Sequence, residues 1–254
     1  MTNNMKPNVL ILRAPGVNCN EETAFAFEQA GAVTEQVHIN RLLEEPKLLE
    51  KFQILCFPGG FSYGDDIAAG RILANQIRHH LCGAMTDFIA ADKLILGICN
   101  GFQALIKSGI LIADDATGPV ATLYENDAEK FHDHWVRLNV TGEKCVFLKG
   151  ITSMYLPVPY SEGRFVTRDA AIFDTLEANG QLVLRYVTED NPNGSQGNVA
   201  GICDATGHVF GLMPHPERHI TVTQHPHWTR LATGTPNAPG DGLAVFQNAV
   251  KYWA

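Results

Sequence analysis

The chain has 254 residues, of which 45% are hydrophobic and 18% charged, and its formal net charge is -8 at pH 7. This is an ordinary globular composition with ample material for a core. The acidic balance, with no block of clustered lysines and arginines, argues against nucleic acid as an electrostatic partner. No segment reaches the roughly 18 uninterrupted apolar residues of a membrane span, and the polar first residues do not form the apolar core of a signal peptide.

The six cysteines are scattered, without C-x-x-C pairs, in a chain large enough to fold without disulfides. A reducing cytoplasm is the simplest setting for such a protein. We therefore expect a cytoplasmic chain that contacts neither nucleic acid nor a membrane.

The first half of the chain alternates short apolar runs with helical segments. Strands are predicted at 9–12, 33–39, 53–57 and 93–96, and helices at 21–31, 42–49, 66–90 and from about 100 onward. Such alternation at short intervals is typical of βαβ units and a parallel sheet.

The rhythm changes after about residue 113, where strand candidates follow one another with little helix between them. They lie at 120–124, 135–140, 154–158, 182–187, 199–203 and 209–213, and a last amphipathic helix is predicted within 242–253. Neither an internal repeat nor a low-complexity linker separates the two halves. We predict a single α/β domain over residues 1–254, in which an antiparallel or mixed extension continues an open, mostly parallel sheet flanked by helices.

The stretch 97–103 reads Gly-Ile-Cys-Asn-Gly-Phe-Gln and lies between a predicted strand and a predicted helix. A strand that runs through a glycine-flanked nucleophile into a helix is a nucleophile elbow. Gly97 and Gly101 lack a Cβ, so strand and helix can approach closely and the backbone can adopt unusual angles. Cys99 would lie beside free helical N–H groups that favour a thiolate. The alternative is a buried, inert thiol, and we keep that interpretation for the five other cysteines.

A cysteine nucleophile needs a base and a group that orients the base. His215 and Glu217 lie two residues apart after the apolar run 209–212. In an extended segment their side chains point to the same side, so His215 can be the base and Glu217 its orienter. Without the elbow, a lone histidine would be read as a structural residue.

A second candidate partner is the turn Pro58-Gly59-Gly60, which follows the strand 53–57. Ligand sites in open α/β sheets form beyond the carboxyl ends of the strands, where this turn and the elbow both lie. Gly59 and Gly60 could turn an N–H toward an oxyanion, and Asn100 could supply a second N–H.

No metal-ligand pattern is convincing. The pairs His132-x-His134 and His225-x-His227 lack nearby cysteine or carboxylate spacing. We therefore expect no metal site.

Three motifs in this order resemble class I (triad) glutamine amidotransferase domains: 58–60, 97–103 and 214–218, the last reading Pro-His-Pro-Glu-Arg. Further detail is similar to the glutaminase subunits of phosphoribosylformylglycinamidine synthases. This closer similarity is carried by residues 57–66, by Asn100 and Phe102 of the elbow, by Asn18-Cys19-Asn20 and by Glu162-Gly163-Arg164-Phe165. The likeness extends from residue 9 to about residue 218.

The resemblance implies a flavodoxin-like fold and hydrolysis of L-glutamine to glutamate and ammonia. It makes Cys99 the nucleophile, His215 the general base and acid, and Glu217 the orienter. The remaining implied positions are oxyanion donors at Gly60 and Asn100 and substrate contacts at Gly59, Phe61 and Gln103.

It also implies a partner, the large formylglycinamidine ribonucleotide synthetase subunit of purine biosynthesis, joined in some systems by a small bridging subunit. No cofactor is expected in this chain, whereas ATP and magnesium are expected on the synthetase. Alternatives stay open: a glutaminase of another amidotransferase, a γ-glutamyl hydrolase, or a non-catalytic binding module of the same fold. An intact Cys99, His215 and Glu217 argue against the binding module.

Two features depart from what the family pattern leads us to expect. Many relatives carry a histidine just before Glu162, where this chain reads Pro159-Tyr160-Ser161. The segment 221–241 is also long, and it is either a loop that meets the partner or an irregular insertion.

Overall fold

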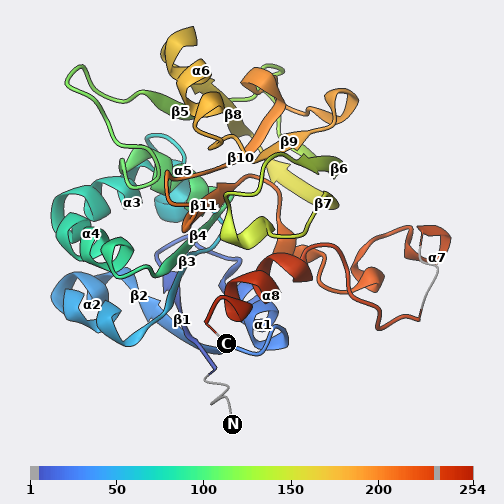
Figure 1. The fold of residues 1–254 in the computed structure, drawn as a ribbon, viewed down its shortest axis with the longest axis horizontal. Helices are drawn as coiled ribbons and strands as arrows, with labels where there is room; N and C mark the ends of the chain where they lie inside the picture. The colour runs from blue at the N-terminus through green and yellow to red at the C-terminus, as the bar shows by residue number, and fades with distance from the viewer. Residues whose placement is uncertain (1–5, 232–234, 254) are drawn as a thin grey trace.

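The computed structural model describes residues 6–231 and 235–253, and within these the centre of the molecule is a nine-stranded sheet (Figure 1). In spatial order its strands are β2 (Val33–His38), β1 (Asn8–Arg13), β3 (Ile54–Phe57), β4 (Leu94–Ile98), β11 (Val209–Leu212), β10 (Val199–Cys203), β9 (Leu184–Tyr186), β6 (His132–Val140) and β7 (Ser153–Tyr160). The first five are parallel and each later strand pairs antiparallel with its neighbour. The predicted open sheet with an antiparallel extension is confirmed. The single domain over 1–254 stays a prediction, with which the unbroken sheet agrees.

The middle of the sheet is covered on both faces. Every residue of β3, β4, β10 and β11 is buried, which is why these strands read as continuous apolar runs rather than as alternating patterns. Edge strand β2 instead carries polar side chains, three of them exposed or half-buried glutamate, threonine and glutamine.

The helices lie around this sheet. They are α1 (Asn20–Gln29), α2 (Ile39–Glu44), α3 (Arg71–Gln76), α4 (Cys82–Ala90), α5 (Asn100–Lys107), α6 (Ala170–Ala178), α7 (Trp228–Leu231) and α8 (Leu243–Lys251). Phe27 of α1 meets Phe246 of α8 edge to face, with ring centroids 4.9 Å apart, so the last helix closes the core beside the first (Figure 1). Within the described residues, none of these helices combines the length and the apolarity needed to cross a bilayer.

Two predicted helices are shorter than expected. The stretch 66–90 begins as a helix only at Arg71, because Gly70 adopts a left-handed conformation (φ +70°), and a π-helical turn at Ile77–Leu81 separates α3 from α4. The stretch 42–49 is divided at Pro46, which ends α2 and starts a 3-10 turn at Pro46–Lys51.

Residues 120–124 were correctly predicted as a strand, but the prediction that this strand belongs to the main sheet was wrong. This segment is β5 (Ala121–Glu125), and it pairs with β8 (Glu162–Thr167) in a separate two-stranded sheet. Sequence analysis missed β8 and also α6. Helix α6 could have been predicted from Asp169, because aspartate is a preferred N-cap residue. Its side chain accepts a hydrogen bond from the Ile172 N–H at 2.9 Å.

Close contact between α5 and the sheet requires glycine at Gly101. A Cβ built there would lie 1.9 Å from the Phe57 carbonyl oxygen, a backbone atom that cannot swing away. We expect Gly101→Ala to lower the free energy of unfolding by about 3 kcal/mol, as overpacking does when backbone must shift. Gly83→Ala is the matched control, because a Cβ there meets nothing within 4 Å. It should raise stability by about 0.5–1 kcal/mol in urea titrations, and equal effects of the two changes would contradict the packing argument.

Candidate active site

Four parallel strands deliver the site residues to one edge of the sheet. The carboxyl ends of β3, β4 and β11 lead to the predicted residues Gly60, Cys99 and His215, respectively, and that of β1 leads to Cys19, which was not predicted. This is where open α/β sheets build their ligand sites.

Cys99 stands at a sharp turn between β4 and α5, as the elbow pattern predicts. Its φ and ψ are +51° and -107°, values that a residue with a Cβ seldom adopts. The strain is borne by the cysteine itself, whereas Gly97 and Gly101 have no positive φ and serve only close packing. The Cys99 N–H donates to the Leu212 carbonyl at 2.8 Å, which fixes the turn to β11. A conformation that costs about 1–3 kcal/mol and is held this way is typical of a functional position.

His215 and Glu217 form the pair that the sequence predicts. His215 Nδ1 lies 2.5 Å from Glu217 Oε1, and the two residues are 1% and 0% exposed. A proton on Nδ1 shared with the carboxylate leaves Nε2 as the atom that can serve Cys99. Nε2 is buried and has no hydrogen-bond partner among the described residues.

The charge state of His215 is set by opposing effects. Burial lowers the pKa of the imidazole, but the Glu217 carboxylate and the Cys99 sulfur outweigh it and hold the pKa well above its usual range. The arrangement therefore favours a protonated imidazole, which can give a proton to a leaving group.

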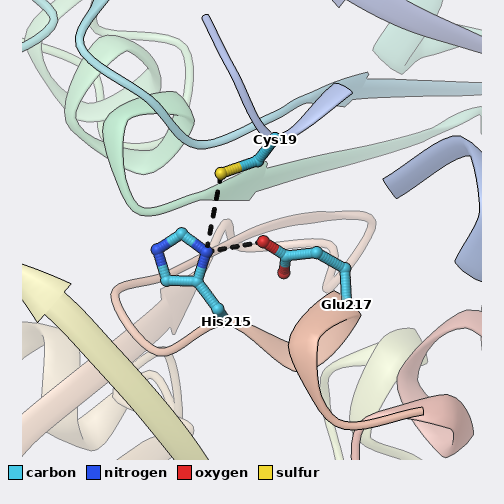
Figure 2. Close-up of side chains that lie close together, drawn as sticks. All are labelled: Cys19, His215 and Glu217. Atoms are coloured by element: carbon cyan, nitrogen blue, oxygen red, sulfur yellow. Dashed lines mark hydrogen bonds and ion pairs between the residues drawn. The ribbon is translucent and has the colours of Figure 1, made fainter. Parts of the chain in front are cut away.

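Sequence analysis missed Cys19, which we treated as an inert thiol. Figure 2 shows it facing the same imidazole edge as Glu217, with its Sγ 4.0 Å from His215 Nδ1. The Arg218 guanidinium donates to this sulfur at 3.2 Å. Burial raises the pKa of the Cys19 thiol, while His215 and Arg218 oppose that rise.

Gly59 makes room for this cluster. A Cβ at Gly59 would lie 2.7 Å from His215 Cε1, 3.2 Å from Cys19 Sγ and 3.5 Å from Cys99 Cβ. Its carbonyl accepts hydrogen bonds from the N–H groups of Asn18 and Cys19. Gly59 was predicted to contact the substrate, but it lines neither of the cavities at the site. Its missing side chain instead leaves room for the three neighbouring side chains.

Cys99 opens into a cavity of about 410 Å³, a size that suits a small ligand. Gly60, Phe61 and Gln103, all predicted near substrate or oxyanion, line it together with Tyr160. Tyr160 is a buried wall residue, since its hydroxyl bonds the Tyr186 hydroxyl at 2.6 Å. Adjoining it, a smaller cavity of about 240 Å³ reaches Cys99, Cys19 and His215 and passes the exposed ring of Phe131.

The predicted oxyanion donors lie beside Cys99. Gly60 has a φ of +141° and lines both cavities, and its N–H forms no hydrogen bond within the described residues. Asn100 is the first residue of α5, so its N–H has no partner inside the helix. Gly60 thus lies on the cavity, whereas Asn100 is buried and lines neither cavity. The oxyanion role of both N–H groups stays a prediction.

The side chains of Asn100 and Gln103 connect the cavity wall to its neighbours, and for Gln103 such a packing role was the alternative to a substrate contact. Asn100 accepts from the Ser62 N–H at 3.1 Å and donates to Asp65 Oδ1 at 2.9 Å and to Gln103 Oε1 at 3.1 Å. Gln103 in turn donates to the Glu162 carbonyl. The nucleophile helix is therefore tied to both the 62–65 loop and β8.

A half-buried ion pair extends this network. Lys107 donates to the Glu162 carboxylate and, at 2.7 Å, to the Ala69 carbonyl. Burial lowers the pKa of Lys107, an effect that Glu162 opposes. Glu162 appeared in the sequence only as part of a motif, and nothing in its spacing pointed to Lys107.

The two histidine pairs lie apart from the site. The rings of His132 and His134 on β6 meet edge to face with centroids 5.5 Å apart, and the His225 ring packs on Trp135 with centroids 4.1 Å apart. The latter contact pins the 221–241 segment to the sheet, and the N-terminal end of that segment is further fixed by a capping box at Thr221. In Figure 1 the part around α7 stands out from the body.

Comparison with known proteins places the chain. Residues 6–253 match the family described as CobB/CobQ-like glutamine amidotransferase domain. The chain therefore belongs to the glutamine amidotransferases, and its fold is that of class I.

Curated relatives narrow this to the PurQ family. A phosphoribosylformylglycinamidine synthase subunit PurQ from Dehalococcoides mccartyi is 46% identical over 98% of both chains, and one from Methanococcus maripaludis is 39% identical over 97% of both. A chain of the solved PurLQS structure from Thermotoga maritima is 31% identical, with a TM-score of 0.76 over 98% of this chain and 100% of that one.

Proposed function

We propose that the chain is the glutaminase subunit of phosphoribosylformylglycinamidine synthase. It hydrolyses L-glutamine and delivers the ammonia to the large synthetase subunit, which uses the ammonia to make formylglycinamidine ribonucleotide in purine biosynthesis. The observation that carries the proposal is the strained Cys99, which faces a cavity beside the buried His215 and Glu217 pair. A binding module that had lost its chemistry would have no reason to hold this cysteine in a costly conformation.

The proposed reaction is acyl transfer through a thioester. The Cys99 thiolate attacks the side-chain amide carbon of glutamine, and the N–H groups of Gly60 and Asn100 hold the negative charge on its oxygen. His215 gives a proton to the departing nitrogen, so ammonia leaves and a γ-glutamyl thioester remains on Cys99.

Hydrolysis completes the cycle with the same residues. His215 takes a proton from water, and the hydroxide attacks the thioester carbon. The Cys99 thiolate then leaves, glutamate is released and the imidazolium is restored. Glu217 keeps Nδ1 protonated throughout, so only Nε2 exchanges protons.

We further propose that this chain uses no cofactor of its own, and that ATP and magnesium act on the synthetase. Every group in the scheme above is an amino-acid side chain or a backbone N–H. With a reducing setting for six free cysteines, we place the protein in the cytoplasm.

Reconstitution with a synthetase subunit tests the assignment. We expect the mixture to form formylglycinamidine ribonucleotide from glutamine, and glutaminase turnover to rise above that of the chain alone. If the synthetase requires a small bridging subunit, addition of that subunit should restore both product formation and the stimulated glutaminase turnover. Glutamine hydrolysis that no synthetase mixture stimulates or couples to product would favour a glutaminase of another amidotransferase or a γ-glutamyl hydrolase.

A further inference from the structure

The cluster beside the catalytic pair contains more metal-binding atoms than the glutaminase reaction uses. Cys19 Sγ, one His215 ring nitrogen and one Glu217 carboxylate oxygen lie within 4.8 Å of one another, and all three residues are buried. Acyl transfer employs His215 and Glu217 but gives no task to Cys19.

We propose that Cys19, His215 and Glu217 form an inhibitory site for a soft divalent cation of the zinc type. Thiolate, imidazole and carboxylate are together the ligand set that zinc prefers, and three protein ligands leave a fourth position open.

The distances require only small movements. Zinc holds sulfur at about 2.3 Å and nitrogen or oxygen at about 2.0–2.2 Å, which puts its ligand atoms about 3.3–3.6 Å apart. The sulfur of Cys19 is 4.0 Å from His215 Nδ1, so it must approach by a few tenths of an ångström. Glu217 Oε1, now 2.5 Å from Nδ1, must move away by less than about 1 Å once zinc replaces the shared proton.

The surroundings contain unmet polar groups that favour a cation. Glu217 is 0% exposed, and its second oxygen, Oε2, is buried with no hydrogen-bond partner among the described residues. Oε2 is therefore available to a metal ion, whose charge would take the place of that of the His215 imidazolium beside Glu217. On the sulfur side, the Arg218 N–H at 3.2 Å can support a thiolate ligand from the outer shell.

A metal can reach the cluster from solvent. The 240 Å³ cavity is lined by Cys19, Cys99 and His215 together with the exposed Phe61 and Phe131. Metal ions therefore have a route to Cys19 Sγ and His215 that does not require unfolding.

Occupation would stop catalysis without touching Cys99. Zinc on Nδ1 takes the place of the proton that Glu217 shares, so neutral imidazole keeps its remaining proton on Nε2. That nitrogen can then accept no proton from the thiol or from water. The glutaminase is thereby switched off by a ligand set that shares two residues with the triad.

Metal binding tests the proposal without any need for turnover. The chain is prepared as Cys99→Ser with the exposed Cys82 also changed to serine, and titrated with Co²⁺ as a spectroscopic substitute for zinc. We expect one equivalent to give a thiolate-to-cobalt charge-transfer band that zinc abolishes, and the band to vanish when Cys19→Ser is added. A band that persists without Cys19, or no band with Cys19 present, overturns the site.

Inhibition gives a second readout. Each variant's glutaminase rate is compared with its own metal-free rate across a zinc titration. Cys19→Ser should raise the zinc concentration for half inhibition by about 100-fold or more, beyond the roughly 10- to 100-fold that loss of an outer-shell partner costs. The exposed Cys82→Ser is the matched control and should leave that concentration unchanged. Equal zinc sensitivity of Cys19→Ser and the unchanged chain would show that inhibition runs through other ligands.

Discussion

Cys99→Ala abolishes glutamine-dependent synthesis in the reconstituted enzyme and leaves ammonia-dependent synthesis intact. The reason is that no other group can form the thioester, whereas the synthetase needs only ammonia from its partner. We expect glutaminase turnover to fall by about 10⁴-fold or more, since loss of a nucleophile removes the covalent route and leaves only binding and oxyanion stabilisation.

The control is Cys82→Ala, which removes an exposed thiol from α4 and should keep both activities. Retained glutaminase turnover in Cys99→Ala would refute the assignment of the nucleophile. Loss of ammonia-dependent synthesis as well would mean that the substitution disturbs the interface with the synthetase rather than the chemistry.

Chemical labelling distinguishes the two sulfurs of the site. A glutamine-mimicking alkylator should inactivate the chain with one label, carried by Cys99. Cys19 shares the smaller cavity and contacts the same imidazole, yet of the two sulfurs only that of Cys99 lines the larger cavity, where we propose that the substrate binds. Label on Cys19 would therefore place the substrate on the wrong side of His215.

Local pattern was enough to predict the triad. Cys99 lies in a strand-glycine-helix context that has one geometric meaning, and His215 and Glu217 are neighbours in sequence, so their contact needs no knowledge of the fold. Four of the five parallel strands were equally predictable, and buried strands such as β3 and β4 are uninterrupted apolar runs. The fifth, β11, was expected in the antiparallel or mixed extension but pairs parallel with β4.

Contacts between distant segments could not be predicted in the same way. Cys19 and His215 are 196 residues apart. Asn18-Cys19-Asn20 carries part of the family resemblance, but nothing in its pattern pointed to a contact between Cys19 and His215. A topological argument could have found it, since Cys19 follows β1 at the edge where the other parallel strands end. Lys107 and Glu162 meet only because β8 packs beside α5.

The roles of Gly59 and Gly60 also could not be predicted from the local sequence pattern. Two adjacent glycines after a strand predict a turn, but which of them offers its N–H and which makes room depends on side chains from elsewhere. The sequence predicted an oxyanion N–H from Gly60 and a substrate contact from Gly59, and of these two residues only Gly60 lines the cavity.

Substitution of the buried Glu217 is expected to cause the second large loss of glutaminase activity. Glu217→Gln keeps the size of the side chain but removes its charge, and its amide can turn an N–H toward Nδ1. That would move the ring proton to Nε2, the wrong tautomer for a base facing Cys99. We expect kcat to fall by about 10²- to 10⁴-fold with little change in KM, because orientation of the base matters in the transition state and not in substrate binding.

The pH dependence of Cys99 alkylation separates this role from a merely structural one. Glu217 helps to hold the pKa of His215 well above its usual range, so His215 stays protonated in the unchanged chain at neutral pH. Without the carboxylate the pKa of His215 falls, and the imidazolium is lost at a lower pH. The pH profile of Cys99 alkylation, which depends on the charge of the adjacent His215, should therefore change in Glu217→Gln. Glu177→Gln, an exposed glutamate on α6, serves as the matched control and should leave both kcat and the alkylation profile unchanged. An alkylation profile identical in Glu217→Gln and the unchanged chain would show that Glu217 fills space in the core and does not control the charge of His215.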